Sequence, residues 1–219
     1  MLRLHSENEK AFLLANEVGE QLLARLALTL AQPKVMVSLG AGINTLTQAL
    51  QKCYPDATLL IPDAQLPLPD HSVDLIIANL ILPWCNDLGV LFTEWQRALR
   101  PNGLLLFSSL GPDTLREWEF GDKLVPHFID MHNIGDLLTQ MQWSDPVLDV
   151  DYVTLSYREI NTLFSDLEIN GFLKSRETPL SSTKEKHLAT YEVIYGSAWC
   201  PVPVSREIKI PLEQVRVTR

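Results

Sequence analysis

The sequence predicts an α/β fold in which helices cover both faces of a doubly wound, mostly parallel sheet. Two runs, residues 73–79 (VDLIIAN) and 104–109 (LLLFSS), are apolar over nearly their whole length, as expected of strands buried on both faces. Helical patterns separate these strands from each other and from an earlier apolar strand at 35–39. Strands that alternate with helices in this way indicate a parallel sheet.

The first third of the chain is predicted to form a helix, a strand, a second helix and a second strand, in that order. Residues 7–31 repeat apolar positions three and four apart, which predicts an amphipathic helix that Pro33 ends. After the strand at 35–39, a helix is expected to run to about Lys52, with a short strand at 57–61 behind it. Two prolines then bar a helix from the loop that follows.

The rest of the chain is expected to place an antiparallel pair of strands beside the parallel core. The expected elements are helices at 87–99, 113–123, 134–141 and 157–170, a turn at 100–103, and strands at 147–153 and 190–198. Neither an internal repeat nor a low-complexity linker interrupts them, so a single domain over 1–219 is predicted. Its parts are an N-terminal helix (1–33), a core (34–109), a second half (110–199) and a tail (200–219).

Composition favours a cytoplasmic globular protein. Apolar residues make up 46% and charged residues 21%, and no apolar run approaches the roughly 18 residues that span a bilayer. Glutamates interrupt the first thirty residues, so no signal peptide is expected. The three cysteines are widely spaced, which favours neither a metal site nor a disulfide. A net charge of −9 argues against nonspecific nucleic-acid binding.

A glycine turn at the end of the first strand predicts a nucleotide-type site. Gly40 and Gly42 lie where a strand passes into a helix, and glycines there let backbone amides approach a ligand closely. Asp63 follows Asn44 by nineteen residues, near the usual spacing of an acid that holds a ribose. Asn79 ends another core strand, so it is expected at the same edge of the sheet.

Several segments together resemble one family. They are LPLPDHSVDL (66–75), NLILPWC (79–85), LRPNG (99–103), LGPDTLRE (110–117), DMHNIGD (130–136), DPVLDVD (145–151) and ATYEVIYG (189–196). The first and third are common among the class I S-adenosylmethionine-dependent methyltransferases, which the chain resembles over roughly residues 17–199. The others resemble the BioC type, the malonyl-[acyl-carrier protein] O-methyltransferases of biotin synthesis.

This resemblance implies a cofactor, a reaction and a set of site residues. The cofactor would be S-adenosylmethionine, and its methyl group would pass in line to the free carboxylate of a malonyl thioester. A carboxylate is already ionised at neutral pH, so no catalytic base is expected. The resemblance makes 34–109 the cofactor-binding core and 110–199 the substrate-side half. Its implied cofactor contacts are Gly40, Gly42, Asn44, Asp63, Ala64 and Asn79.

The resemblance also implies substrate contacts, for each of which the residues leave an alternative open. These are Trp84, Arg116 and His132. Trp84 is equally consistent with packing under its loop. For His132 a structural hydrogen bond is the favoured alternative. Arg116 is equally consistent with a surface ion pair. Two segments of net charge +2, 174–187 and 205–219, suit an acidic acyl-carrier protein, although a solvated surface explains them too.

Three departures from the family pattern put cofactor binding in question. Ser38 replaces an acidic residue, Asn44 replaces a third glycine, and one helix and one strand are expected to be missing after 57–61. As a result Asp63 and Ala64 fit both the ribose-binding and the adenine-binding positions. One alternative is therefore a degenerate paralogue that no longer binds S-adenosylmethionine and acts as a binding or regulatory protein. Another is the related branch that assembles respiratory complexes by modifying arginine on a partner. The oligomeric state stays open.

Overall fold

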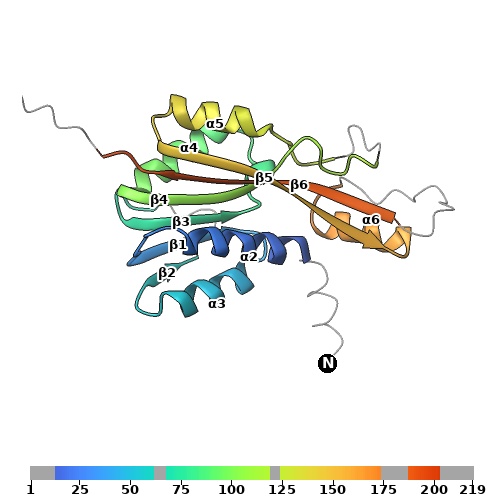
Figure 1. Cartoon of the computed structure of the whole chain (residues 1–219), viewed down its shortest axis with the longest axis horizontal. Helices are drawn as coiled ribbons and strands as arrows, with labels where there is room; N and C mark the ends of the chain where they lie inside the picture. Colours follow the sequence, from blue (N-terminus) through green and yellow to red (C-terminus); the bar gives the residue numbers. More distant parts are fainter. Residues whose placement is uncertain (1–12, 62–67, 119–123, 174–186, 203–219) are drawn as a thin grey trace, which may run out of the picture.

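The sheet of the computed structural model has six strands in the order β2-β1-β3-β4-β6-β5 (Figure 1). The structure describes residues 13–61, 68–118, 124–173 and 187–202, without the side chains of residues 43 and 44. The strands are β1 (Val35–Gly40), β2 (Thr58–Leu60), β3 (Val73–Asn79), β4 (Leu99–Leu110), β5 (Ser144–Tyr157) and β6 (His187–Trp199). The first four are parallel, whereas β6 runs antiparallel to both β4 and β5. The predicted fold class is confirmed.

Helices cover both faces of this sheet and give it two cores. One core joins α2 (Leu13–Ala27), α3 (Ile43–Cys53) and α6 (Ile160–Ile169) to one face. The other joins α4 (Leu88–Ala98) and α5 (Met131–Gln140) to the opposite face, and Figure 1 shows the two layers above and below the strands. No helix of the described residues is both long and apolar enough to cross a membrane.

The helix boundaries follow from capping residues. The Asp87 side chain accepts a hydrogen bond from the Val90 amide, and Asp130 accepts one from the His132 amide. Each carboxylate thereby satisfies an amide that has no partner within the helix, which explains why α4 and α5 begin immediately after these residues. The prediction of a helix over 87–99 agrees with α4 to within a residue at each end.

The connection from β2 to β3 is short. Its described residues, Ile61 and 68–72, contain neither a helix nor a strand. β2 is therefore the edge strand beside β1, and β1 pairs directly with β3 on its other side. This topology agrees with the predicted lack of one helix–strand unit.

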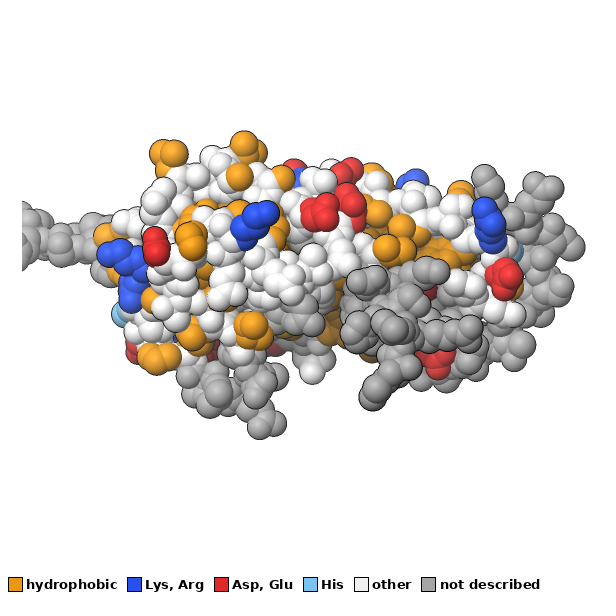
Figure 2. All heavy atoms as spheres, turned by 90° about the horizontal axis from the view of Figure 1, so that it is seen from below, with side chains coloured by type: hydrophobic (Ala, Val, Ile, Leu, Met, Phe, Trp, Pro, Cys, Tyr) orange, Lys and Arg blue, Asp and Glu red, His pale blue; other side chains and the backbone are white. Residues whose placement is uncertain are grey.

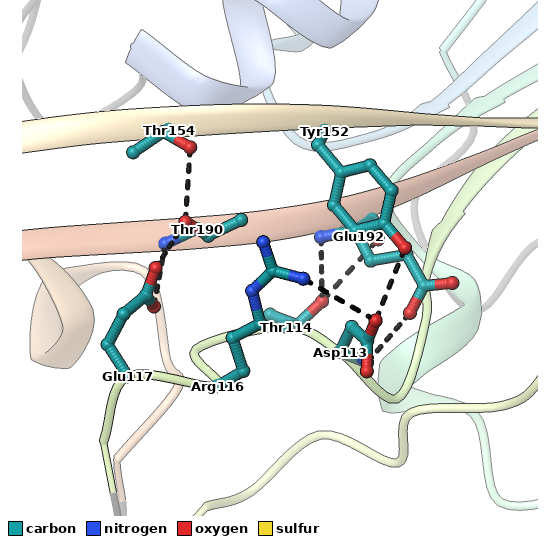
Figure 3. Close-up of polar contacts among 8 residues, drawn as sticks. All are labelled: Asp113, Thr114, Arg116, Glu117, Tyr152, Thr154, Thr190 and Glu192. Atoms are coloured by element: carbon teal, nitrogen blue, oxygen red, sulfur yellow. Dashed lines mark hydrogen bonds and ion pairs between the residues drawn. The ribbon is translucent and has the colours of Figure 1, made fainter.

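The predicted helix over 113–123 is wrong for its described residues, because 112–118 form turns instead. Leu115 has a left-handed backbone (φ 59°), and its amide donates to the Thr190 carbonyl rather than within a helix. Gly111 likewise donates to the Glu192 carbonyl of β6. The segment thus continues along the edge of β6 where β4 ends, and bonds to the sheet outweigh its helical propensity (Figure 3).

The predicted turn at 100–103 lies inside β4 as an irregularity. Val73 of β3 pairs with Leu99, but Leu75 pairs with Leu104, so the strand bulges between these partners. Asn102 adopts a left-handed backbone (φ 61°) there, as a tight turn requires. The predicted turn is therefore wrong: residues 100–103 belong to β4, and the left-handed Asn102 marks a bulge in that strand.

Gly196 offers a test of packing in the core of the sheet. A Cβ at Gly196 would lie 2.1 Å from Cζ of the buried Phe107 ring. We expect Gly196→Ala to lower the free energy of unfolding by about 1–3 kcal/mol, because the Phe107 ring is fully buried and would have to shift against its neighbour Phe92. Chemical denaturation measures the change.

Gly135→Ala is the matched control for that substitution. Gly135 lies within α5, and a Cβ there would have its nearest neighbour, Leu148, at 3.5 Å. Alanine is the better helix former, so a gain of about 0.5–1 kcal/mol is expected. Equal effects of the two substitutions would contradict the packing argument.

Candidate functional site

The glycine turn brings the ends of β1 and β3 into contact. Gly40 has φ 97°, and a Cβ on it would lie 2.0 Å from the Asn79 carbonyl oxygen, so only glycine fits. The Ala41 amide donates to that same oxygen at 2.8 Å. Gly42 is also left-handed, with φ 63°, and α3 begins directly after it. The turn thus places the N-terminus of α3 at the carboxyl edge of the sheet, as the sequence predicts.

The buried side chain of Asn79 holds this edge together. Its Nδ2 donates to the Ala15 carbonyl of α2 at 2.7 Å and to the Ala41 carbonyl at 2.9 Å. Its Oδ1 accepts a hydrogen bond from the Ser108 hydroxyl of β4 at 2.9 Å. Both amide hydrogens are therefore used within the protein. Asn79 lies at the predicted site, and the role that its contacts give it is to position the turn.

Strained backbone follows Asn79. Leu80 has a left-handed conformation (φ 51°), which is uncommon for a bulky residue, and its amide donates to the Ser108 hydroxyl at 2.9 Å. The chain then enters a short 3-10 helix, η1 (Leu82–Trp84), which presents Trp84 at the edge of the sheet. Strain of this kind persists where surrounding contacts fix the backbone, and it is frequent at binding sites.

A pocket of about 260 Å³ lies at this edge. It is formed by the start of α2, the glycine turn, the segment after β3 and the end of α6. The lining residues are Leu14, Ala15, Gly40, Ala41, Leu80, Ile81, Trp84, Asn170 and Phe172. The rings of Trp84 and Phe172 meet edge to face, with centroids 5.5 Å apart. The pocket adjoins the ends of two neighbouring parallel strands, where open α/β sheets bind their ligands.

The pocket is nearly neutral in charge. None of its described lining residues carries a charge, and Asn170 and the Trp84 indole supply its polar side-chain groups. Beneath the turn, Ser38 is fully buried on β1, and its hydroxyl has no hydrogen-bond partner among the described residues. The acid that the family resemblance places at position 38 is thus replaced by an unpaired neutral group.

A polar cluster stands behind Asn170. Asp166 of α6 accepts hydrogen bonds from the Tyr157 hydroxyl at 2.5 Å and from Asn170 Nδ2 at 3.1 Å. Burial raises the pKa of Asp166, although both hydrogen bonds favour its ionised form. Burial also raises the pKa of Tyr157, which therefore stays protonated. The sequence did not single out Asn170 or Phe172, because the end of an amphipathic helix gave no sign of facing a turn far away in the chain.

The other predicted cofactor contacts are only partly described. Gly42 faces a small gap of about 100 Å³ between α2 and α3, where a Cβ on it would lie 3.2 Å from that of Ala15. The side chain of Asn44, and Asp63 and Ala64 entirely, lie outside the described residues. Their roles stay predictions.

Arg116 lies on the other face of the β5–β6 pair. Its guanidinium is 5.3 Å from the Tyr152 ring centroid and 3.7 Å from an Asp113 carboxylate oxygen (Figure 3). Tyr152 points away from the face on which its neighbour Val153 packs with α6. No contact among the described residues joins Arg116 to the pocket, and its ion pair with Asp113 matches the alternative considered from the sequence.

His132 also lies apart from the pocket. It belongs to the first turn of α5, its side chain is 81% exposed, and its Nδ1 lies 2.8 Å from the Asp130 carboxylate. The neighbouring Asn133 and Asp136 line a larger groove of about 650 Å³ against the start of α4. Among the predicted residues with described side chains, Gly40 and Trp84 therefore line the pocket, and Asn79 is buried directly behind Gly40.

Comparison with known proteins places the chain in a family. A model described as a methyltransferase domain matches residues 29–107. The chain is 33% identical to the malonyl-[acyl-carrier protein] O-methyltransferase of Methylovorus sp. (strain MP688), over 88% of this chain and 84% of that protein. It is 31% identical to malonyl-[acyl-carrier protein] O-methyltransferase 1 of Coxiella burnetii, over 90% and 87% of the two chains. The chain belongs to this methyltransferase family.

Solved structures agree with this fold. An Archaeoglobus fulgidus SAM-dependent methyltransferase superposes with a TM-score of 0.52 at 12% identity, over 89% of this chain and 99% of that one. Haemonchus contortus phosphoethanolamine N-methyltransferase 2, solved with phosphomonomethylethanolamine and S-adenosylhomocysteine, also gives 0.52 at 12% identity, over 84% and 53%. At such low identity the likeness shows the fold alone.

The alignment with the Methylovorus protein also shows how much shorter this chain is than its relative. It spans 249 positions but includes 88% of 219 residues, about 193, so about 56 positions have no counterpart in this chain. Part of this difference is expected between β2 and β3, where the sequence predicts that one helix and one strand are missing.

Asn79→Ala tests the role of the amide at the sheet edge. The substitution leaves the buried Ala15 carbonyl without its donor and the buried Ser108 hydroxyl without its acceptor, and we expect it to lower the free energy of unfolding by about 2–3 kcal/mol. Asn133→Ala, at an exposed position of α5, is the control and should change it by less than about 0.5 kcal/mol. Similar losses in both variants would contradict the role assigned to Asn79.

Asp166 should make stability depend on pH. The pKa of Asp166 in the folded protein is raised above its unfolded value of about 4. The contribution of Asp166 to the free energy of unfolding is therefore complete below the unfolded pKa and is lost as pH rises through the folded pKa. We expect the stability of the wild type relative to Asp166→Asn to fall over this range. Denaturation of both proteins from acid to neutral pH measures the difference, and a flat or rising difference would contradict the assignment.

Proposed function

We propose that the protein transfers a methyl group from S-adenosylmethionine to the free carboxylate of a malonyl thioester on an acyl-carrier protein, as a step of biotin synthesis in the cytoplasm. The observation that carries the proposal is the pocket beside the Gly40 turn, in a chain one-third identical to a protein named for this reaction. The pocket supplies a place for the reaction, and the names of the relatives supply the substrate.

The residues around the pocket fit the amino-acid half of the cofactor. The close approach at Gly40, which a Cβ there would prevent, exposes the backbone of Gly40 and Ala41 to a ligand in the pocket. About 260 Å³ is less than the roughly 300–1,000 Å³ of most complete small-molecule sites. The adenosine half would then lie toward the end of β2, next to the predicted contacts Asp63 and Ala64. When bound, the cofactor supplies an electrophilic methyl group.

The chain itself contributes orientation and exclusion of water. The malonyl carboxylate reacts in its ionised form, so a pocket without a titratable lining group is sufficient. Trp84 and Phe172 form an aromatic wall that keeps water from the reacting atoms. Holding the two reactants in line supplies the rest of the rate enhancement.

The acyl-carrier protein remains part of the proposal. The basic segments proposed to bind it, 174–187 and 205–219, lie outside the described residues except for His187. On the face shown in Figure 2, the described Lys and Arg side chains are scattered rather than gathered. Arg116 and His132 remain proposed contacts for the incoming substrate, although both lie apart from the pocket.

A degenerate paralogue that serves as a binding or regulatory protein is the second candidate. Two observations favour it: the unpaired hydroxyl of Ser38 at the position of the family's acid, and the short connection from β2 to β3 beside the adenosine position. Both weaken cofactor binding rather than the fold. Cofactor affinity is therefore the quantity that separates the two candidates.

Calorimetric titration with S-adenosylhomocysteine is the first experiment. Binding should be followed by incubation with S-adenosylmethionine and malonyl-acyl-carrier protein, and mass spectrometry should show a gain of one methyl group. Acetyl-acyl-carrier protein, which lacks the free carboxylate, is the control and should gain nothing. A protein that binds neither cofactor form would overturn the proposal and favour the degenerate paralogue.

A further inference from the structure

The orientation of the Asn170 amide is fixed by its neighbours. Its Nδ2 donates to the Asp166 backbone carbonyl at 2.8 Å and to the Asp166 carboxylate at 3.1 Å. Both partners are acceptors, so the NH₂ group must face them and both of its hydrogens are used. The amide oxygen, Oδ1, receives no hydrogen bond from any described residue, and Asn170 lines the pocket. The amide oxygen is therefore the side-chain polar atom with which Asn170 can meet a ligand of this pocket.

Asp166 is itself held in place. The Tyr157 hydroxyl donates to the second carboxylate oxygen, and both groups are partly buried between α6 and the end of β5. Reversal of the Asn170 amide would direct its oxygen at two acceptor oxygens and lose two hydrogen bonds. The chain of contacts from Tyr157 through Asp166 to Asn170 thus selects one of the two amide orientations.

This acceptor matters because none of the described residues that line the pocket carries a negative charge. A positively charged ligand that enters it leaves water, and that loss must be offset by acceptors or aromatic faces. Among the described residues, Ser38 contributes no charge, and the lining is otherwise apolar apart from the Trp84 ring and the backbone of the turn. Asn170 lines the same pocket as Gly40 and Ala41, and its two hydrogen bonds to residue 166 hold the amide dipole in one orientation.

We propose that Asn170 recognises the positive charge of the methyl donor through its amide oxygen, and that Asp166 acts as a positioning residue that keeps this oxygen directed into the pocket. The inference rests on the proposed function, since it takes the pocket to hold the cofactor. It assigns to the residue that caps the C-terminus of α6 the recognition of charge that the family pattern would place at position 38. The sulfonium cofactor should therefore bind more tightly than its neutral product because of Asn170.

The test compares S-adenosylmethionine with S-adenosylhomocysteine by calorimetry. Asn170→Leu keeps the approximate size of the side chain and removes the acceptor, so the affinity ratio of the charged to the neutral ligand should fall about tenfold. Asn161→Leu, at an exposed position of the same helix, is the matched control and should leave this ratio unchanged. Thermal unfolding of each variant verifies that the fold is intact.

Asp166→Asn tests the positioning role separately. An amide at position 166 can donate as well as accept, so one of the two contacts that oppose reversal of the Asn170 amide is lost while the bond to the backbone carbonyl of residue 166 remains. The affinity ratio should therefore fall in this variant too, but by less than in Asn170→Leu. A purely structural role for Asp166 would weaken both ligands equally and leave the ratio unchanged, which would overturn its assignment.

The outcomes separate this inference from the proposed function. A wild-type protein that binds both ligands, with an unchanged ratio in Asn170→Leu, overturns the inference and leaves the proposed function standing. A wild-type protein that binds neither ligand overturns both. A fall of the ratio in both variants, with the control unaffected, supports the assignment of charge recognition to Asn170.

Discussion

The hydrogen bonds of the buried Asn79 amide hold the functional edge of this protein together. They join three segments distant in sequence: α2 through Ala15, the glycine turn through Ala41, and β4 through Ser108. Because the side chain is fully buried, no water can replace these bonds when one partner shifts. The pocket lies between these same segments, so its shape depends on the Asn79 amide more than on the residues that would touch a ligand.

The shortened connection after β2 leaves that arrangement intact. β1 pairs with β3 over five residues, whereas β2 pairs with β1 over three and forms the edge of the sheet. Losing a helix and a strand beyond β2 removes structure at the margin and leaves the adjacent ends of β1 and β3 unchanged. The amino-acid half of a cofactor site can survive such a loss, while the adenosine half loses its outer support.

The sequence predicted most accurately those helices and strands that are specified by their own residues. The apolar run 73–79 coincides with β3, and the helix predicted over 87–99 coincides with α4 to within a residue at each end. The helix expected from 113 was wrong because bonds to β6 hold that segment, and no local pattern reports a distant partner. The same limit applies to the site. Strand ends predicted Gly40 and Asn79, but Asn170 reaches the pocket only through the packing of α6.

The neutral character of the pocket follows from how charge behaves in a protein interior. A carboxylate at position 38 would be fully buried, and it would need strong donors or a bound cation to stay ionised. Serine at this position avoids the cost of burying a charge and leaves only an unpaired hydroxyl. Replacing the acid by serine is therefore less costly for the ligand-free protein than for a protein that must hold a cation. Recognition of a positive ligand must then come from groups that are stable without one. A hydrogen-bonded amide such as Asn170 meets this requirement, since its dipole is fixed by Asp166 whether or not the pocket is filled.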